Sequence, residues 1–179
     1  SSAASDVYKR QMLDAVSEST APAGSQPTRS SAQTRRVAAI DIGTNSTHLL
    51  VASVDTTLGT FSIEQAEKST TRLGERDPDS GELTSEGMQR GYETLRRFRD
   101  LAMSHEVEQI VTAATSAVRE APNGREFLQS IQDGLGIDVD LVSGPEEARL
   151  IYLGVLSGMS FGDRPHLVLD IGGGSTELI

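Results

Sequence analysis

The apolar positions near the start of the chain form short runs that are typical of neighbouring strands. Val37–Ile40 is a short continuous apolar run, the pattern of a strand. Thr47–Val54 and Thr60–Glu67 are rich in β-branched and apolar residues, and short polar stretches separate all three runs. This succession predicts three strands that follow one another in a meander.

A change in the apolar spacing marks the next segment. Between Thr84 and Ser104 apolar side chains recur at steps of three or four residues, which places them on one face of a helix. They are Met88, Tyr92, Leu95, Phe98 and Ala102. Thr84 suits the N-cap position of this helix. We therefore predict a long amphipathic helix over Thr84–Ser104.

Apolar runs and helical segments alternate in the remainder of the chain. Strands are predicted at Val107–Ala113, Ile137–Val142 and Leu167–Ile171, and helices at Gly124–Asp133 and Pro145–Met159. Three strands, followed by helices and strands in alternation, predict an α/β fold with a mixed sheet. The sequence stops eight residues after the last predicted strand. We expect that strand to lack partners, and to be unpaired or docked on a wrong edge.

The first 36 residues show no pattern of this kind. Of the 18 residues from Ser17 to Thr34, eight are Ser or Thr, and the only apolar side chains are Ala and Pro. Such a segment cannot bury enough surface to offset its ordering entropy. Asp6–Gln11 resembles a translated sequencing adaptor, so residues 1–11 are interpreted as an artefact. We predict a disordered tail over residues 1–36.

Composition narrows the classes of function. Residues 37–179 carry 11 Lys/Arg and 23 Asp/Glu, and this acidic balance argues against general nucleic-acid binding. The chain has no cysteine, which excludes disulfides and thiolate metal sites and favours a cytoplasmic protein. No apolar run approaches the length of a membrane span. A polyanion bound here would require metal ions and oriented backbone amides.

The strongest signal is an internal repeat. The segment Asp41–Thr47 (DIGTNST) recurs as Asp170–Thr176 (DIGGGST), with five identical positions of seven and an offset of 129 residues. Each copy follows an apolar strand. The offset has the length of a domain, so the repeat predicts two similarly built lobes, each with one such turn.

The residue types of the repeat suit phosphate chemistry. A carboxylate at a strand end can hold a hard cation such as Mg²⁺. The glycine that follows lets the backbone approach a phosphate, and successive amides and hydroxyls can donate hydrogen bonds to phosphate oxygens. Neither copy has the spacing of a dinucleotide fingerprint or a Gly-Lys-Ser/Thr loop. The alternative interpretation is a tight hairpin turn in which the Asp serves only the turn.

The paired turns resemble phosphate loops one and two of the acetate kinase, sugar kinase, Hsp70 and actin superfamily. Five segments narrow this resemblance: Asp41–His48 (DIGTNSTH), Arg72–Glu75 (RLGE), Ala114–Arg119 (ATSAVR), Ser143–Gly154 (SGPEEARLIYLG) and Asp170–Leu178 (DIGGGSTEL). Through them the chain resembles the exopolyphosphatase/guanosine pentaphosphate phosphohydrolase family of this superfamily. The family often has Asn where this chain has Pro145, and proline suits the first position of a helix.

The resemblance implies a fold and a division into domains. It implies a ribonuclease H-like (actin-like ATPase) lobe with a mixed sheet over residues 37–160, including a connecting helix. Residues 161–179 would be the truncated start of a second, similar lobe. A homodimer through the missing C-terminal part is also expected. Because most of one cleft wall would then be absent, we expect residues 1–179 alone to be inactive.

The resemblance also implies roles for individual residues. Glu147 would be the catalytic carboxylate that orients or deprotonates water, and Arg119 would assist by binding phosphate. The metal, Mg²⁺ or Mn²⁺, would be held by Asp41, Asp170 and Glu177. The residues expected to bind phosphate are Gly43, Thr44, Asn45, Ser46, Gly172, Gly173, Gly174 and Ser175.

Each role has a plainer alternative. Glu147 could merely favour the helix dipole, and Arg119 could form a surface ion pair. Glu177 and Arg149 could belong to the cleft or to the scaffold. His48 is interpreted as a strand or cleft residue, and none of the three histidines is expected to bind metal.

The implied activity is hydrolysis of terminal phosphoanhydride bonds in polyphosphate or guanosine pentaphosphate, with release of orthophosphate. Two alternatives remain open. One is a phosphotransferase of the same superfamily, which would need an adenosine pocket. The other is a non-enzymatic sensor of an alarmone or polyphosphate. No nucleic-acid or membrane partner is expected.

Overall fold

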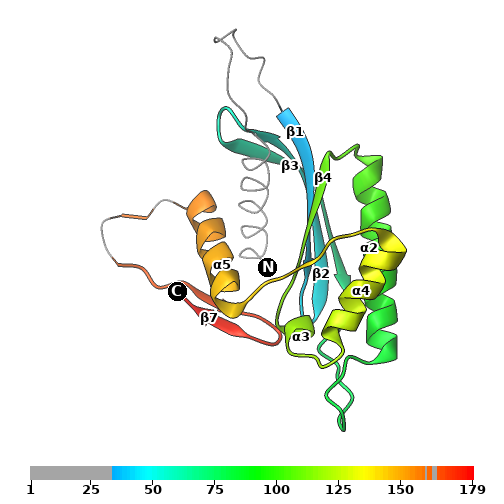
Figure 1. Ribbon diagram of the computed structural model, residues 1–179. Coiled ribbons are helices and arrows are strands. Elements are labelled where there is room, and N and C mark those ends of the chain that lie inside the picture. Colours follow the sequence, from blue (N-terminus) through cyan, green and yellow to red (C-terminus); the bar gives the residue numbers. More distant parts are fainter. Residues whose placement is uncertain (1–33, 160, 163–164) are drawn as a thin grey trace, which may run out of the picture.

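The computed structural model describes residues 34–159, 161–162 and 165–179, so most of the predicted tail lies outside the described residues. A five-stranded sheet forms the centre of the molecule, in the order β3-β2-β1-β4-β5 (Figure 1). Its strands are β1 (Thr34–Ile42), β2 (Ser46–Asp55), β3 (Thr60–Thr70), β4 (Gln109–Ala114) and β5 (Asp140–Leu141). The pairs β1–β2 and β2–β3 are antiparallel, whereas β1–β4 and β4–β5 are parallel. The predicted α/β fold with a mixed sheet is confirmed.

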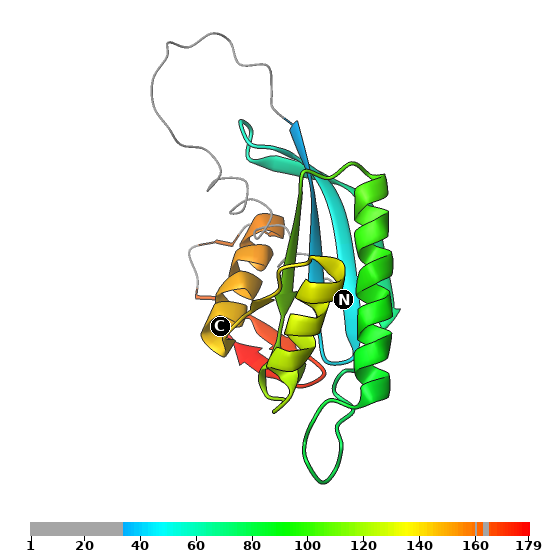
Figure 2. The ribbon, with the colours of Figure 1, turned by 45° about the vertical axis from the view of Figure 1, so that its right-hand side comes forward.

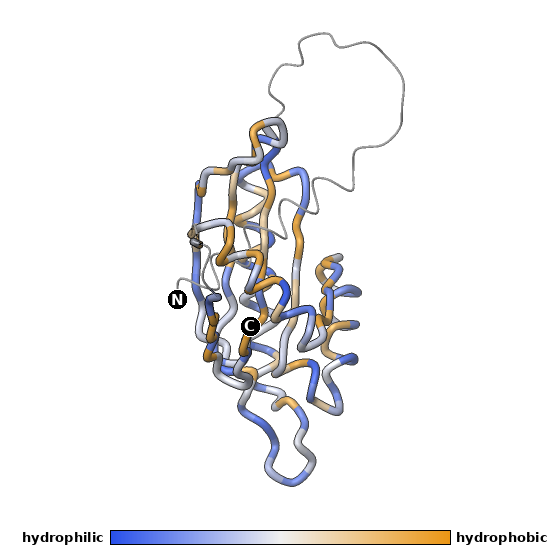
Figure 3. Tube along the Cα trace, turned by 90° about the vertical axis from the view of Figure 1, so that its left-hand side faces the viewer, coloured by the Kyte–Doolittle hydropathy of each residue, from blue (hydrophilic) through white to orange (hydrophobic). Residues whose placement is uncertain are grey.

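Two helices cover one face of this sheet, α2 (Ser85–Ser104) and α4 (Gly124–Leu135) (Figure 2). Leu95 and Phe98 of α2 and Ile131 of α4 are fully buried against apolar residues of β1 and β2. Thr84 caps α2, because its side chain accepts a hydrogen bond from the Gly87 amide. Hydrophobic positions concentrate along the strands, while the loop between β3 and α2 is hydrophilic (Figure 3).

The opposite face of the sheet carries α5 (Gly144–Gly158), with the two-stranded sheet β6–β7 beside it (Figure 2). Leu150 of α5 packs against Ala113 of β4 and Val142, which fixes the start of the helix near the ends of β1 and β4. Ser143 caps α5 by accepting from the Glu146 amide, and Pro145 lies in its first turn. These contacts bring the acidic start of α5 to the edge of the sheet where β1 ends.

Several predicted boundaries need correction. β1 begins at Thr34 instead of Val37, because Arg35 pairs with Glu108 and Arg36 with Glu64, and these pairs hold the polar start of the strand to its neighbours. The strand predicted at Ile137–Val142 is only the two residues of β5. Ile137 packs into the main core and adds no strand pairing. A short helix, α3 (Ser116–Arg119), was not predicted.

The expectation that the last strand lacks a partner was wrong. β6 (Leu169–Ile171) pairs antiparallel with β7 (Thr176–Leu178), and the Val168 and Ile179 backbones extend the hairpin by two hydrogen bonds. The repeated turn itself supplies the partner by reversing the chain. Within the described ranges, no helix is long and apolar enough to cross a membrane.

Candidate functional site

The first repeat forms the tight turn between β1 and β2. The Gly43 amide donates to the Ser46 carbonyl at 3.1 Å, and Asp41 and His48 are register partners across the turn. A Cβ added to Gly43 would lie 2.9 Å from the Ser46 carbonyl oxygen, closer than a side chain tolerates. The turn therefore needs glycine at this position.

The chain after β3 holds this turn in place. The Thr71 and Arg72 amides both donate to the Asn45 carbonyl, at 3.1 and 3.0 Å, and the Gly74 amide donates to the Thr44 carbonyl at 2.8 Å. Arg72 has a φ of 50°, an uncommon conformation for a residue with a side chain. The Arg72–Glu75 segment was part of the family resemblance, but no role was predicted for it. Its backbone hydrogen bonds now indicate a role. It fixes the carbonyls of the first turn.

The second repeat forms the same turn between β6 and β7. The Gly172 amide donates to the Ser175 carbonyl at 3.0 Å, and Asp170 pairs in register with Glu177 as Asp41 does with His48. The internal repeat in the sequence is therefore a repeat in structure. Each turn places its Asp one residue before the reversal, at the end of a strand.

The two turns meet. A Cβ built on Gly174 would lie 2.6 Å from the Thr44 hydroxyl and 2.9 Å from that of Ser116, and one on Gly173 would collide with Asn45. Thr44 and Ser116 are themselves hydrogen-bonded through their hydroxyls at 3.1 Å. Only glycines allow the second turn to approach the first this closely.

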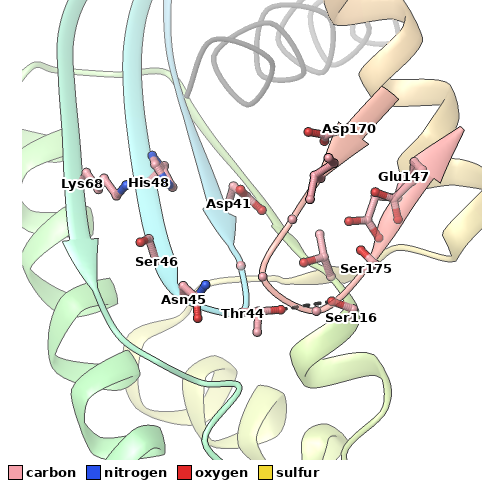
Figure 4. A pocket seen from close by; sticks show the side chains of 17 residues that line it. Asp41, Thr44, Asn45, Ser46, His48, Lys68, Ser116, Glu147, Asp170 and Ser175 are labelled. Atoms are coloured by element: carbon pink, nitrogen blue, oxygen red, sulfur yellow. Dashed lines mark hydrogen bonds between the residues drawn. The ribbon is translucent and has the colours of Figure 1, made fainter. Parts of the chain in front are cut away.

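The meeting turns border a cavity of about 370 Å³, shown from close by in Figure 4. Twelve predicted site residues line it: Asp41, Gly43, Thr44, Asn45, Ser46, Glu147, Asp170, Gly172, Gly173, Gly174, Ser175 and Glu177. Five further residues complete the lining: His48, Lys68, Thr115, Ser116 and Ile171. Lys68 and Ser116 were not predicted as site residues, although Ser116 lies in the ATSAVR segment that carries the resemblance.

Arg119 does not line the cavity. It contacts Glu147 instead. One nitrogen, Nη1, donates to Glu147 Oε2 at 2.9 Å and to the Val142 carbonyl at 2.8 Å. These two bonds connect α3, the end of β5 and the first turn of α5. Neighbouring Glu146 instead forms a surface pair with Arg149 at 2.7 Å. The predicted contact of Arg119 with phosphate stays a prediction.

The sequence profile of the Ppx/GppA phosphatase family matches residues 50–179, which include Glu147 and the whole second turn. The chain belongs to this family. The resemblance drawn from the sequence motifs is thereby confirmed.

Solved structures of Ppx/GppA proteins share the fold. A family member from Aquifex aeolicus is 32% identical, with a TM-score of 0.70, over 82% of this chain and 47% of its own. An exopolyphosphatase from Cytophaga hutchinsonii is 36% identical, with a TM-score of 0.76, over 81% of this chain and 46% of its own. The chain thus spans about half the length of these relatives.

The carboxylates of this Ppx/GppA site lie close enough to disturb one another. Burial, aided by the charges of Glu147 and Asp170, raises the pKa of Asp41 to about 7. Burial also raises the pKa of Glu147, against the opposing effect of its hydrogen bond from Arg119. Both groups are therefore held in an environment that disfavours their charged forms, a pattern common at functional sites.

His48 and Lys68 form the other side of the Ppx/GppA cavity. They are register partners on β2 and β3, and burial followed by the Lys68 charge lowers the pKa of His48. Burial thus favours a neutral imidazole beside a charged ammonium. The cavity is acidic toward α5 and β6–β7, and basic toward β3.

The metal ligands predicted for this family member reach one cavity from two sheets. Asp41 ends β1, while Asp170 and Glu177 face each other in register on β6 and β7. In the part of the chain that the structure describes, no three carboxylates or histidines cluster as a ready-made metal centre. The donors are hard oxygens, as Mg²⁺ prefers, and such sites usually complete their shell with water and substrate phosphates.

Proposed function

We propose that the protein hydrolyses the terminal phosphoanhydride bond of inorganic polyphosphate or guanosine pentaphosphate and releases orthophosphate. One observation carries the proposal: two like turns face a half-buried carboxylate, Glu147, across one cavity. The family assignment supports a phosphatase, and the Cytophaga hutchinsonii relative is described as an exopolyphosphatase. The absence of cysteine suits a cytoplasmic enzyme.

The reaction requires a water molecule, a base and a stabilised leaving group. Glu147 orients the water and accepts its proton as the water oxygen bonds to the terminal phosphorus. The bond from that phosphorus to the bridging oxygen breaks, and the shortened chain keeps the electron pair. General-base help of this kind contributes about 10²–10⁴-fold.

The two turns supply the cradle for the terminal phosphate. Backbone amides and the hydroxyls of Thr44, Ser46 and Ser175 border the cavity, where they can donate to phosphate oxygens. Because the Arg72–Glu75 segment already fixes the carbonyls of the first turn, little reorganisation accompanies binding. Arg119 holds the Glu147 carboxylate in position.

The donor set of the cavity fits Mg²⁺ or Mn²⁺. Asp41, Asp170 and Glu177 would hold the ion. Burial and, to a smaller extent, the charges of Glu147 and Asp170 raise the pKa of Asp41, and a bound cation would favour its charged form. Bound Mg²⁺ neutralises charge on the phosphoryl oxygens. Polyphosphate and guanosine pentaphosphate present the same terminal anhydride, so this chemistry serves either substrate.

The test is phosphate release by the full-length protein, meaning this chain in its complete native sequence. Tripolyphosphate and guanosine pentaphosphate are supplied with Mg²⁺, and Glu147→Gln is compared with wild type. We expect kcat to fall by about 10²-fold or more with substrate affinity nearly intact. Glu146→Gln is the matched control, because Glu146 is exposed and paired with Arg149.

The outcomes also separate the alternatives. A loss of less than fivefold in Glu147→Gln would remove this residue from the mechanism. Phosphate transfer to ADP or a metabolite, without release, would identify a phosphotransferase. Tight binding with no turnover in wild type would identify a sensor.

A further inference from the structure

Lys68 places a positive charge in a cavity whose acidic lining residues are four carboxylates. It is the register partner of His48, and His48 is the partner of Asp41. Register partners on neighbouring strands present their side chains to the same face. Asp41, His48 and Lys68 therefore form a row across β1, β2 and β3, as Figure 4 shows.

The ammonium group of Lys68 has no ion-pair partner among the described residues. Elsewhere in those residues, Arg35, Arg90 and Arg119 each have a carboxylate within 3 Å. Three of the four cavity carboxylates belong to α5 and the β6–β7 hairpin, whereas Asp41 lies beyond His48 on β1. None of the four is within ion-pair distance of Lys68 in the part of the chain described. Its charge is thus directed into the cavity without being neutralised by the protein.

Lys68 and Glu147 lie at opposite ends of the cavity. Lys68 belongs to β3, the edge strand, whereas α5 packs beside β4 and β5 through Leu150. Figure 4 shows Asp41 between the two residues. A phosphate chain with its terminal group beside Glu147 would extend its remaining phosphates along the row toward β3.

We propose that Lys68 is a specificity residue that binds the phosphates which are not transferred, on the leaving-group side of the scissile bond. This inference rests on the proposed function. As the anhydride bond breaks, the bridging oxygen becomes the terminal oxygen of the shortened chain and gains negative charge. Lys68 acts on that chain as a point charge, the usual way in which lysine binds phosphate. His48 lies between Lys68 and Asp41 in the row and adds an imidazole N–H donor.

The decisive experiment measures tripolyphosphate binding by calorimetry in a Glu147→Gln background, where hydrolysis is slow. Lys68→Met should weaken binding by about tenfold or more, the usual effect of removing a charge-assisted hydrogen bond. Lys68→Arg should keep binding within about threefold of the parent. Binding of orthophosphate, which is too short to extend from the turns to β3, should change less than about threefold.

Arg96→Gln is the matched control. It removes the same charge from an exposed position on α2, on the other face of the sheet, and should leave binding unchanged. Equal weakening in Arg96→Gln would show general electrostatics and overturn the proposal. So would unaltered tripolyphosphate binding in Lys68→Met, or no tripolyphosphate binding by the parent.

A chemical measurement tests the same contact without mutation. Lys68 is the one lysine between residues 12 and 179, so an amine-reactive reagent followed by mass spectrometry of the peptides reports on it individually. Tripolyphosphate should slow labelling of Lys68 by at least about fivefold, if its ammonium contacts phosphate. Equal labelling with and without ligand would exclude the contact.

Failure of the inference is distinguishable from failure of the proposed function. If wild type releases phosphate through Glu147 and Lys68→Met matches it in KM, only the role of Lys68 is wrong. If tripolyphosphate binding depends on Lys68 but no phosphate is released, the hydrolase proposal is wrong and the binding site stands.

Discussion

Arg119 and Glu147 illustrate how one contact can change the role of a residue. Arg119 donates hydrogen bonds to Glu147 and to the Val142 carbonyl, and it does not line the cavity. Its charge lowers the pKa of Glu147, while burial raises it. Arg119 is therefore placed to orient the Glu147 carboxylate and to influence its pKa. This is a positioning role, distinct from the direct phosphate contact that the resemblance implied.

This positioning role predicts a shift in the pH profile. In Arg119→Met the Glu147 carboxylate loses its cation, so its pKa should rise further and the acid limb of kcat/KM should move to higher pH. We expect kcat to fall by about tenfold, with partial recovery in Arg119→Lys. Steady-state rates of the full-length protein from pH 5 to 9 provide the measurement. A rise in KM with an unmoved acid limb would favour a direct phosphate contact instead.

Asp41 predicts a pH dependence of stability. Its folded pKa of about 7 lies above its ordinary value of 3.8, so the folded state binds the extra proton between these values. Stability contributed by protonated Asp41 is complete at low pH and is lost as the pH rises through 7. Asp41→Asn removes that loss. In the presence of a chelator, its Tm should exceed that of wild type by about 3 °C or more at pH 8 and by clearly less at pH 5, where only part of the loss between pH 3.8 and 7 has occurred.

The control for this measurement is Asp138→Asn, which removes a charge from an exposed position in the loop before β5. Its Tm difference from wild type should be the same at both pH values. If Asp41→Asn also gives the same difference at pH 5 and pH 8, the carboxyl of Asp41 is not destabilised by burial.

Some of these residues can be found from sequence and others cannot. Asp41 lies in a motif whose residue types point to phosphate chemistry, whereas the role expected for Glu147 came from the family resemblance. Lys68 lies 20 residues from His48, and its place in the cavity depends on the register of β1 with β2 and of β2 with β3. No local pattern encodes such a register. Ser116 reaches the cavity only because α3 turns the chain directly after β4.

At the scale of elements, the sequence predicted best where the periodicity is long. The helix expected at Thr84–Ser104 differs from α2 by one residue, because its apolar stripe extends over about four turns and a capping threonine precedes it. α3 was missed because four residues carry no measurable period. The length of β5 was overestimated, because Ile137 and Val142 pack into two different apolar clusters and lie outside the strand.

The contact between the two turns is also a property of elements, and it predicts a mutation effect. In Gly174→Ala the new methyl group would meet the hydroxyls of Thr44 and Ser116, so the second turn must move away from the first. A displacement of about 1 Å can reduce the rate by roughly 10²-fold. We expect at least a tenfold loss of kcat/KM in the full-length protein with little change in Tm.

Gly162→Ala is the control for this substitution, because a Cβ there has no atom within 4 Å. It should retain the wild-type kcat/KM. Normal activity in Gly174→Ala would mean that the turns need not touch during the reaction.

At the scale of the molecule, the burial of apolar residues differs between the five-stranded sheet and the β6–β7 hairpin. The five-stranded sheet and its two helices bury most of their large apolar residues, with Ile63 of β3 and Met103 of α2 as exposed exceptions. By contrast, Leu169, Ile171 and Leu178 of the β6–β7 hairpin are 53%, 72% and 69% exposed. A two-stranded hairpin with an uncovered apolar face is marginal in water. The first turn is thus rigidly supported by the sheet, whereas the second turn rests on a weakly supported hairpin.

This difference predicts that residues 1–179 alone will not turn over substrate, although they contain every residue assigned to the site. The positions of Asp170 and the second turn depend on the stability of the β6–β7 hairpin. If the hairpin moves, one side of the phosphate-binding site is lost. Purified residues 1–179 should release no phosphate from tripolyphosphate with Mg²⁺. Amide exchange should be fast over β6–β7 and slow in β1, β2 and β4. Turnover that depends on Mg²⁺ and disappears in Glu147→Gln would show that the hairpin needs no further support, and would overturn the two-turn mechanism as stated.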